Sequence, residues 1–231
     1  MAKITFSLPP MTLPIMQPVI GALRGRGDPS ALDERRVAII GTREPSDESL
    51  EIAWRISTQA VQHGVCVVSG LALGIDTAAH QAALEAQGRT IAVLANGLLS
   101  GVYPAANRGL AERIVQQGGL LISELADDAR PDKNAFVLRD RIQAALCDAV
   151  IVIEAGISSG TLHTARYAAA AGIPVYVVVP RNSDARYAGN AALLAGNWLP
   201  AGYSRVALPD GLPAPQSLAN RAAVEQLLAN H

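Results

Sequence analysis

Glycines and hydroxyl side chains are concentrated in two short segments of this 231-residue sequence, SGLALGID (69–76) and SSGTLHTA (158–165). Each segment follows an apolar run and opens a stretch of helical composition. The unpaired amides and the dipole of a helix start attract anions, so both segments are candidates for binding phosphate. Ordinary helix capping, with Asp76 as the cap of its helix, is the structural alternative.

Neither segment has the pattern of a common nucleotide-binding loop. Both lack the G-K-[ST] of a P-loop, so no lysine is placed to reach a terminal phosphate. The first apolar run is followed by GTREPS (41–46) instead of the G-x-G-x-x-G of dinucleotide-binding folds. The sequence therefore argues against a P-loop NTPase and against a Rossmann dehydrogenase.

Polar residues and glycines recur at the ends of the other apolar runs as well. Because the carboxyl ends of parallel strands meet at one edge of a sheet, where ligands bind, we expect a continuous binding edge. The candidates for binding phosphate there are Gly41, Thr42, Arg43, Ser69, Gly70, Gly74, Asp76, Asn96, Ser158, Ser159, Gly160 and Thr161.

The segment 129–146 combines one aromatic residue, Phe136, with basic residues. These are Arg130, Lys133, Arg139 and Arg141. Basic side chains beside an aromatic ring suit a strip that follows a sugar–phosphate backbone and stacks a base. Asp132 and Asp140 partly neutralise the segment, and a helix entry with solvated charges is the alternative. Composition and spacing alone favour that alternative.

The remaining reactive side chains do not form a recognisable site. The four histidines lack the spacing of a metal site or of a Ser/His/Asp constellation, so we expect no catalytic residue, metal or cofactor. Cys66 and Cys147 have no partner at metal or redox spacing, which is typical of core thiols in a reducing compartment. No apolar run approaches membrane-spanning length. We therefore expect a cytoplasmic protein that does not enter a membrane.

The charge balance also limits the function. A net charge of −1 gives no attraction of the whole molecule to nucleic acid or to an anionic membrane. Charged residues make up 17% of the chain, against roughly 25% in average globular proteins. A surface this poor in charge hints at self-association.

Strand-like and helix-like segments alternate along most of the chain. Six apolar, β-branched runs predict strands, and most are apolar throughout, which is typical of strands covered on both faces. They lie at 37–40, 65–69, 90–95, 120–123, 149–154 and 175–179, with helices at about 46–63, 76–87, 105–117, 137–147 and 160–171. The alternation predicts an α/β fold with a doubly wound, mostly parallel sheet.

The composition at the two ends differs from that of the middle. Residues 1–34 predict an irregular lead-in that includes one strand, and residues 35–204 predict the doubly wound domain. Residues 205–231 predict a tail with a short final helix capped at Ser217.

Between residues 37 and about 197 the sequence resembles the DNA-processing protein A family (DprA, also called Smf). The resemblance rests on motifs in the family's order, including VAIIGTREPSDES, VVSGLALGID, GGLLISE, FVLRDRIQAAL and DAVIVIEAGISSGTLHTA. It implies an extended Rossmann-like fold that binds single-stranded DNA without a catalytic step. It also implies a homodimer that helps to load the recombinase RecA onto DNA in natural transformation. We expect a compact, divergent member without the flanking helical and winged-helix domains of many relatives.

The resemblance also implies roles for single residues. Arg43 matches the arginine of the family's GSR/GTR motif and would grip phosphate. The two glycine turns match SGLARGID and SGSLITA, which implies a phosphate pocket. Phe136, Arg139 and Arg141 match FPxRNR, so the basic segment becomes an expected DNA contact.

Several positions depart from the family's pattern. Leu73 stands at the arginine of GLARGID, and Val137 and Asp140 replace the proline and asparagine of FPxRNR. Ala95 replaces a common glycine, and His163 a common aliphatic residue. One positive charge is lost and one negative charge is gained along the expected DNA path, which lowers affinity and its salt dependence.

A nucleotide-binding sensor or a nucleotide-hydrolysing enzyme is the alternative function for the same edge. The related cytokinin-activating phosphoribohydrolases carry PGGxGTxxE after a comparable strand. Aligning SGTLHT on that motif places Thr164 at the glutamate, so the catalytic carboxylate is missing there. Glu124 or Glu154 could substitute for it, but binding of single-stranded DNA is the favoured function.

Overall fold

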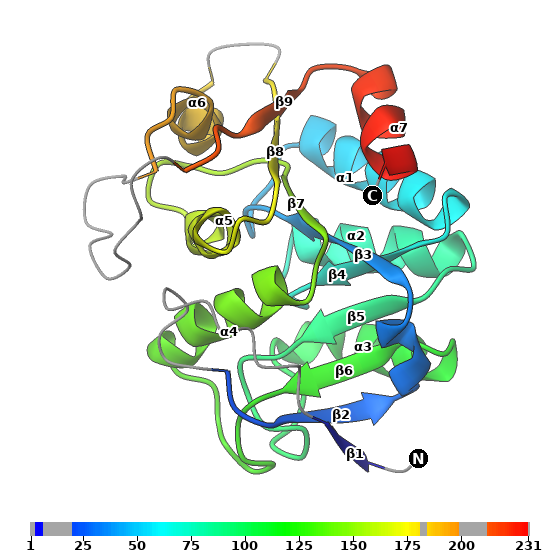
Figure 1. The fold of residues 1–231 in the computed structure, drawn as a ribbon. Coiled ribbons are helices and arrows are strands. Elements are labelled where there is room, and N and C mark those ends of the chain that lie inside the picture. Colours follow the sequence, from blue (N-terminus) through cyan, green and yellow to red (C-terminus); the bar gives the residue numbers. More distant parts are fainter. Residues whose placement is uncertain (1–2, 7–19, 181–183, 199–211, 231) are drawn as a thin grey trace.

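The computed structural model describes residues 3–6, 20–180, 184–198 and 212–230 (Figure 1). These residues form a nine-stranded sheet with helices on both faces. The strands are β1 (Lys3–Phe6), β2 (Leu23–Gly27), β3 (Arg35–Ile40), β4 (Val65–Ser69), β5 (Thr90–Val93), β6 (Leu120–Ser123), β7 (Ala149–Val152), β8 (Val175–Val178) and β9 (Gln216–Leu218).

The helices lie in two layers. In Figure 1, α4, α5 and α6 are on one side of the sheet, and α1, α2, α3 and α7 are on the other. None of the helices in the described ranges combines the length and the apolar character that crossing a membrane requires. The helices are α1 (Asp47–Gln62), α2 (Ile75–Glu85), α3 (Arg108–Gln116), α4 (Lys133–Ala145), α5 (Thr161–Ala170), α6 (Ala188–Leu194) and α7 (Arg221–Asn230).

The strand order is β1-β2-β6-β5-β4-β3-β7-β8-β9. All pairings from β6 to β9 are parallel, whereas β1 with β2 and β2 with β6 are antiparallel. The predicted doubly wound, mostly parallel sheet is therefore confirmed. The chain builds outward from β3 to β6, and α4 then carries it back to β7 on the other side of β3. The order reverses between β3 and β7, which is the place where such sheets bind ligands.

Burial on both faces explains why the strand runs are apolar throughout. In β3, Val37 and Ile39 pack into the cluster beneath α1, α2 and α7. Ala38 and Ile40 point the other way, into the cluster that includes α4 and α5. Because side chains alternate along a strand, a run of four apolar residues supplies both layers of the core.

The segment before the first predicted strand takes part in the sheet. In β2, Gly25 pairs with Ile122 of β6, and Leu23 is fully buried. This part of the expected irregular lead-in therefore extends the sheet by antiparallel pairing at one edge. Only residues 3–6 and those from 20 onward are described in this segment.

The predicted cap of the last helix is wrong. Ser217 lies in β9, which pairs in parallel with β8, and α7 begins only at Arg221. Asn220 caps this helix, because its side-chain oxygen accepts a hydrogen bond from the Ala223 amide at 3.0 Å. The expected boundary between residues 204 and 205 lies outside the described residues.

Gly74 directly precedes α2, at the point where the start of this helix contacts the loop after β3. Its φ is 78°, and a Cβ at this position would lie 2.4 Å from the Thr42 carbonyl oxygen. The neighbouring Ile75 amide donates a hydrogen bond to that oxygen at 3.2 Å. A residue without a side chain thus lets α2 approach the loop that carries Arg43.

Gly74→Ala is expected to lower the free energy of unfolding by about 1–3 kcal/mol, because alanine would be strained at this φ and would collide with backbone atoms. Urea denaturation followed by circular dichroism measures the change. Gly109→Ala is the matched control, since a Cβ on this exposed glycine of α3 meets open space. Equal stabilities of the two variants would contradict the close approach at Gly74.

A candidate phosphate-binding cavity at the strand ends

A cavity of about 450 Å³ lies beyond the carboxyl end of β3, at the reversal point of the sheet. The loop after β3 forms one wall, one face of α4 forms a second wall, and the start of α5 forms a third. This volume is within the range of small-molecule binding sites. The cavity brings together predicted residues from four separate segments: Gly41, Thr42, Arg43, Asp76, Phe136, Arg139, Ser159, Gly160 and Thr161.

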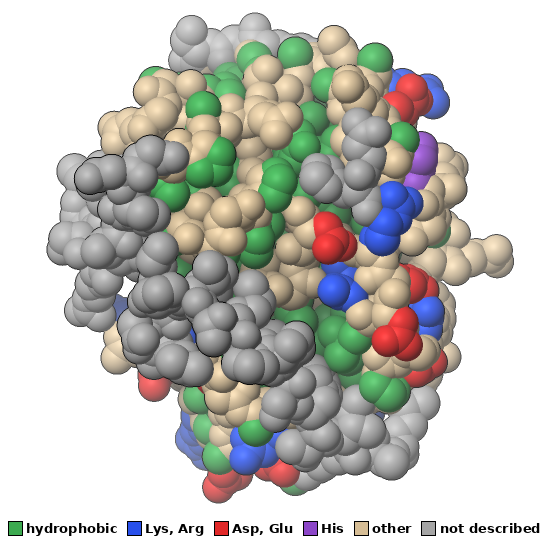
Figure 2. Space-filling model, in the orientation of Figure 1, with side chains coloured by type: hydrophobic (Ala, Val, Ile, Leu, Met, Phe, Trp, Pro, Cys, Tyr) green, Lys and Arg blue, Asp and Glu red, His purple; other side chains and the backbone are tan. Residues whose placement is uncertain are grey.

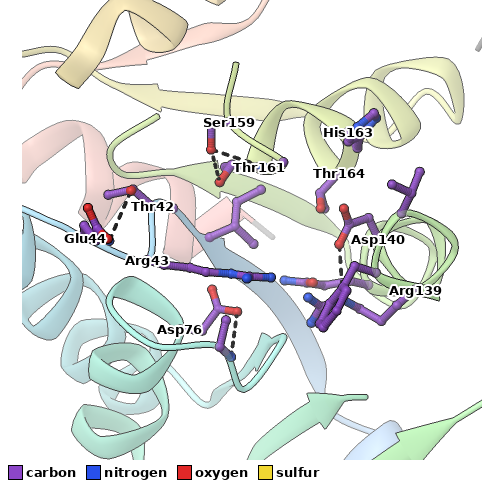
Figure 3. A pocket seen from close by; sticks show the side chains of 17 residues that line it. Thr42, Arg43, Glu44, Asp76, Arg139, Asp140, Ser159, Thr161, His163 and Thr164 are labelled. Atoms are coloured by element: carbon purple, nitrogen blue, oxygen red, sulfur yellow. Dashed lines mark hydrogen bonds and ion pairs between the residues drawn. The ribbon is translucent and has the colours of Figure 1, made fainter. Parts of the chain in front are cut away.

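Arg43 is the exposed cation of this cavity. Its guanidinium carbon lies 5.0 Å from the ring centroid of Phe136, a cation–π arrangement that holds the side chain across the cavity (Figure 3). The Phe136 ring in turn lies 5.5 Å from the ring of Tyr103. Among the described residues, no carboxylate forms an ion pair with Arg43. Its N–H groups therefore remain able to bind an anion.

The start of α5 presents hydroxyl groups to the same cavity. The Ser159 hydroxyl donates to the Thr161 hydroxyl at 3.0 Å and accepts from the Thr161 amide at 3.3 Å. The next two amides bond to carbonyl groups within the turn, at 3.2 and 2.9 Å. The expectation of unpaired amides at this helix start is thus only partly met. The helix dipole and the Thr161 hydroxyl are the features that remain to meet an anion. Ser158 is exposed and is not among the described residues that line the cavity.

Arg139 lies in the cavity wall but is 7% exposed. Its Nη1 donates to the Val93 carbonyl at 3.0 Å, and its Nε lies 3.1 Å from Oδ1 of Asp140. Gly70 leaves the space for the guanidinium, since a Cβ there would lie 1.5 Å from Nη1. The first glycine of SGLALGID therefore seats Arg139, and the arginine supplies a fixed positive charge.

Asp76 closes the turn between β4 and α2. Its carboxylate accepts hydrogen bonds from the amides of Gly70 at 3.1 Å and Ala72 at 3.2 Å. It is the second residue of α2, not the cap, so the predicted capping role is corrected. Ser69 is fully buried, and its hydroxyl donates to the Ile39 carbonyl at 2.7 Å. Both residues shape the turn and do not present donors to a ligand.

Arg141 and Asn96 are two predicted phosphate-binding residues whose side chains are buried in contacts within the protein instead. Arg141 is 1% exposed, and its Nη2 contacts both carboxylate oxygens of Glu124, at 2.9 and 2.7 Å. The Asn96 side chain is buried and donates to the carbonyl groups of Gly97 and Gly101, at 2.9 and 2.7 Å. Arg139 and Arg141 are two residues apart on α4, and residues at that spacing do not share a helix face.

Buried acids lower the anion affinity of the cavity. The pKa of Asp140 is raised to about 7, mainly by burial and also by the nearby Asp76 carboxylate, while Arg139 and Arg43 oppose the increase. Burial also raises the pKa of Asp76. Burial lowers the pKa of His163 to about 4, so this imidazole is neutral near pH 7. Protonation of Asp140 therefore decides how positive the cavity is near neutral pH.

Two further residues of the cavity were not identified from the sequence. Gln143 and Thr164 line it and are 2% exposed each. Gln143 lies seven residues after Phe136, on the same face of α4, so helical periodicity is the signal that could have found it. Outside the cavity, the face in Figure 2 shows Lys and Arg side chains beside Asp and Glu side chains.

Comparison with known proteins places these features in a family. Residues 9–198 match the family described as DNA recombination-mediator protein A. Protein Smf of Synechocystis is 46% identical over 132 residues, which is 57% of this chain and 33% of that protein. The chain spans between 33% and 56% of the lengths of the curated relatives that it matches.

Two solved structures have the same fold and appreciable sequence identity. DNA processing protein A from Helicobacter pylori, described for its single-stranded DNA binding mode, gives a TM-score of 0.81 at 29% identity and covers 99% of this chain and 97% of that chain. DprA from Streptococcus pneumoniae gives a TM-score of 0.75 at 34% identity, covering 84% and 69% respectively. The chain therefore belongs to the DNA recombination-mediator protein A (DprA/Smf) family.

Proposed function

We propose that the protein binds single-stranded DNA by holding backbone phosphates at the mouth of the cavity. The observation that carries this proposal is the exposed Arg43 guanidinium, stacked on Phe136 and directed into the cavity next to the start of α5. A guanidinium offers several N–H donors in a planar fork that matches phosphate oxygens. The neighbouring ring supplies a surface on which a base can stack. The H. pylori relative, whose description names single-stranded DNA binding, supports the same assignment.

The charge distribution indicates how this binding works. The protein carries a net charge of −1, and the surface in Figure 2 mixes both signs of charge. Affinity then comes from a few phosphates held in one place, and few counterions are released on binding. Leu73, 46% exposed beside Phe136 and Tyr103, adds an apolar contact and no phosphate contact at the position where the family usually has arginine.

The proposal extends to the cellular role. We propose that the protein acts in the cytoplasm as a homodimer, without a catalytic step, and supports recombination or natural transformation by loading RecA onto DNA. The free, buried thiols of Cys66 and Cys147 suit a reducing compartment. The family's description as a recombination mediator supports the link to RecA.

The two carboxylates that could replace the missing phosphoribohydrolase glutamate are engaged elsewhere. Glu124 pairs with Arg141. Glu154 accepts hydrogen bonds from the amide and the hydroxyl of Ser46, at 3.0 and 2.8 Å. Neither is among the described residues that line the cavity. This supports a binding role over hydrolysis of a nucleotide.

Arg43→Ala is expected to weaken binding to an oligothymidine about tenfold, because it removes a charge-assisted phosphate contact. The slope of log affinity against log salt should fall by about 0.7, the contribution of one phosphate on a single strand. Fluorescence anisotropy over a salt series measures both quantities. Arg113→Ala removes the same charge from an exposed site in the last turn of α3, and neither quantity should change. A salt slope that is unchanged in Arg43→Ala would reject the proposed contact.

Binding to oligothymidine is expected to weaken about threefold to tenfold between pH 6 and pH 8. The charged groups around Asp140 are Arg139 on its own helix, Asp76 on α2 and Arg43 on the loop after β3. Tyr167 on α5 also faces it and stays neutral, because burial raises its pKa. Since the pKa of Asp140 is about 7, rising pH adds a negative charge to the cavity and repels phosphate.

Asp140→Asn provides the control for this pH dependence. Its affinity for oligothymidine should be higher than that of the parent protein at pH 8 and nearly constant from pH 6 to 8. Anisotropy titrations at fixed ionic strength measure it. The same pH dependence in both proteins would show that another group titrates.

A further inference from the structure

A strained turn contacts the loop that carries Arg43. This turn, residues 70–74, connects β4 to α2, and its Ala72 lines the cavity. Leu71 within the turn has a φ of 60°, a conformation that residues other than glycine rarely adopt, and its side chain is fully buried. Such a conformation costs free energy and persists only where neighbouring groups hold it. The groups that hold this turn therefore bear on the shape of the site.

Asn107 holds the turn from a separate segment, at the start of α3. Its side-chain Nδ2 donates to the Leu71 carbonyl at 2.8 Å and to the Thr77 hydroxyl at 2.9 Å, and it lies 3.3 Å from the Ala72 carbonyl. The Thr77 hydroxyl itself donates to the Ala72 carbonyl at 2.7 Å. Because carbonyl oxygens only accept hydrogen bonds, the nitrogen of the Asn107 amide, and not its oxygen, must face them.

The amides of the same turn are bound on the other side. The Asp76 carboxylate accepts from the amides of Gly70 and Ala72 (Figure 3). Donors of the turn are thus matched by Asp76, and its acceptors are matched by Asn107. Without the Asn107 amide, the buried Leu71 carbonyl would lose this donor, and a buried polar group without a partner is unfavourable. The turn would then rearrange.

The end of the turn is in close contact with the backbone of the Arg43 loop. The Ile75 amide donates to the Thr42 carbonyl at 3.2 Å. A Cβ on Gly74 would lie only 2.8 Å from the Arg43 carbonyl oxygen, so the two segments touch without a gap. A shift of the turn therefore moves the backbone from which the Arg43 side chain extends.

Asn107 also belongs to the segment that supports the aromatic ring beside Arg43. Its backbone amide donates to the Pro104 carbonyl at 3.0 Å. The preceding residue, Tyr103, has its ring 5.5 Å from the ring of Phe136, on which the Arg43 guanidinium stacks. One residue thus connects the backbone that carries Arg43 with the rings that orient its side chain.

We propose that Asn107 is a positioning residue that holds the Arg43 guanidinium in place for a DNA phosphate. Asn107 is 5% exposed and is not among the described residues that line the cavity, so it acts through the turn and not on the ligand. The inference rests on the proposed function, because that function supplies the phosphate. A merely structural role would lower stability and leave the affinity of the folded protein for DNA unchanged.

Asn107→Leu removes the amide donor and leaves the net charge unchanged. The affinity for an oligothymidine is expected to fall about fivefold, and the salt slope should fall as in Arg43→Ala, because a displaced guanidinium loses its phosphate. Fluorescence anisotropy measures both quantities at a temperature where circular dichroism shows the variant to be folded. Leu227→Ala is the control, since it truncates a buried side chain on α7 and lowers stability, and its affinity should equal that of the parent protein.

A double variant separates positioning from general damage. If Asn107 acts through Arg43, Asn107→Leu should cause almost no further loss of affinity in a protein that already carries Arg43→Ala, because coupled residues give non-additive effects. Equal losses in the two backgrounds would overturn the inference, and so would an affinity of Asn107→Leu equal to that of the parent protein. If Asn107→Leu does not fold, Thr77→Val gives the same comparison, with an expected loss of about twofold to threefold for the weaker change.

Hydrogen exchange tests the inference without DNA. The Ile75 amide, bonded to the Thr42 carbonyl, reports the contact between the turn and the Arg43 loop. Its exchange rate, measured by NMR, is expected to rise at least about tenfold in Asn107→Leu and to change far less in Leu227→Ala. If the parent protein binds no oligothymidine, the proposed function fails, while faster exchange in Asn107→Leu would still support the positioning of Arg43. An unchanged exchange rate would overturn the inference.

Discussion

The Arg139 guanidinium is buried where α4 meets the ends of β4 and β5. It bonds to the Val93 carbonyl, lies against Asp140 and occupies the space that Gly70 leaves free. A buried arginine needs a nearby opposite charge, which Asp140 supplies here, so this position allows little movement of α4. Because α4 is fixed here, Phe136 lies at the mouth of the cavity and Asp140 and Gln143 lie within it. The geometry of the candidate site depends on this contact.

The same contact explains why the two arginines of the cavity have different roles. Arg139 is compensated by neighbouring acids and acts as part of the framework. Arg43 forms no ion pair among the described residues and contacts the Phe136 ring, and a cation–π contact orients a guanidinium without using its N–H donors. One arginine thus maintains the shape of the cavity, while the other stays available for a ligand. Arg141, with Glu124, holds α4 to the loop after β6 and stands apart from the cavity.

Many of the family's motif residues have structural roles. Gly74 allows the close approach of α2 to the loop after β3, Asp76 closes the turn between β4 and α2, and Ser69 bonds across two strands. Such residues determine where Arg43 and Phe136 lie, although they offer nothing to a ligand. The positions where this chain departs from the family's pattern are different in kind. Leu73 is exposed near the cavity, and Asp140 lines it, so both bear on what is bound.

The sequence by itself determined the layered architecture and the edge at which the site lies. Runs such as 65–69 and 120–123 match β4 and β6 residue for residue, because strands covered on both faces must be apolar throughout. The start of α4 was misplaced by four residues, since Asp132, whose carboxylate accepts from the Ala135 amide at 2.8 Å, begins the helix earlier than the apolar pattern suggests. Only the tertiary structure decided which arginine of the basic segment lines the cavity. Arg139 lines the cavity because of the rotation of α4 and the space at Gly70. Arg141 instead forms an ion pair with Glu124, which is distant in the sequence. Such choices depend on contacts between segments far apart in the chain, which residue types and local spacing do not encode.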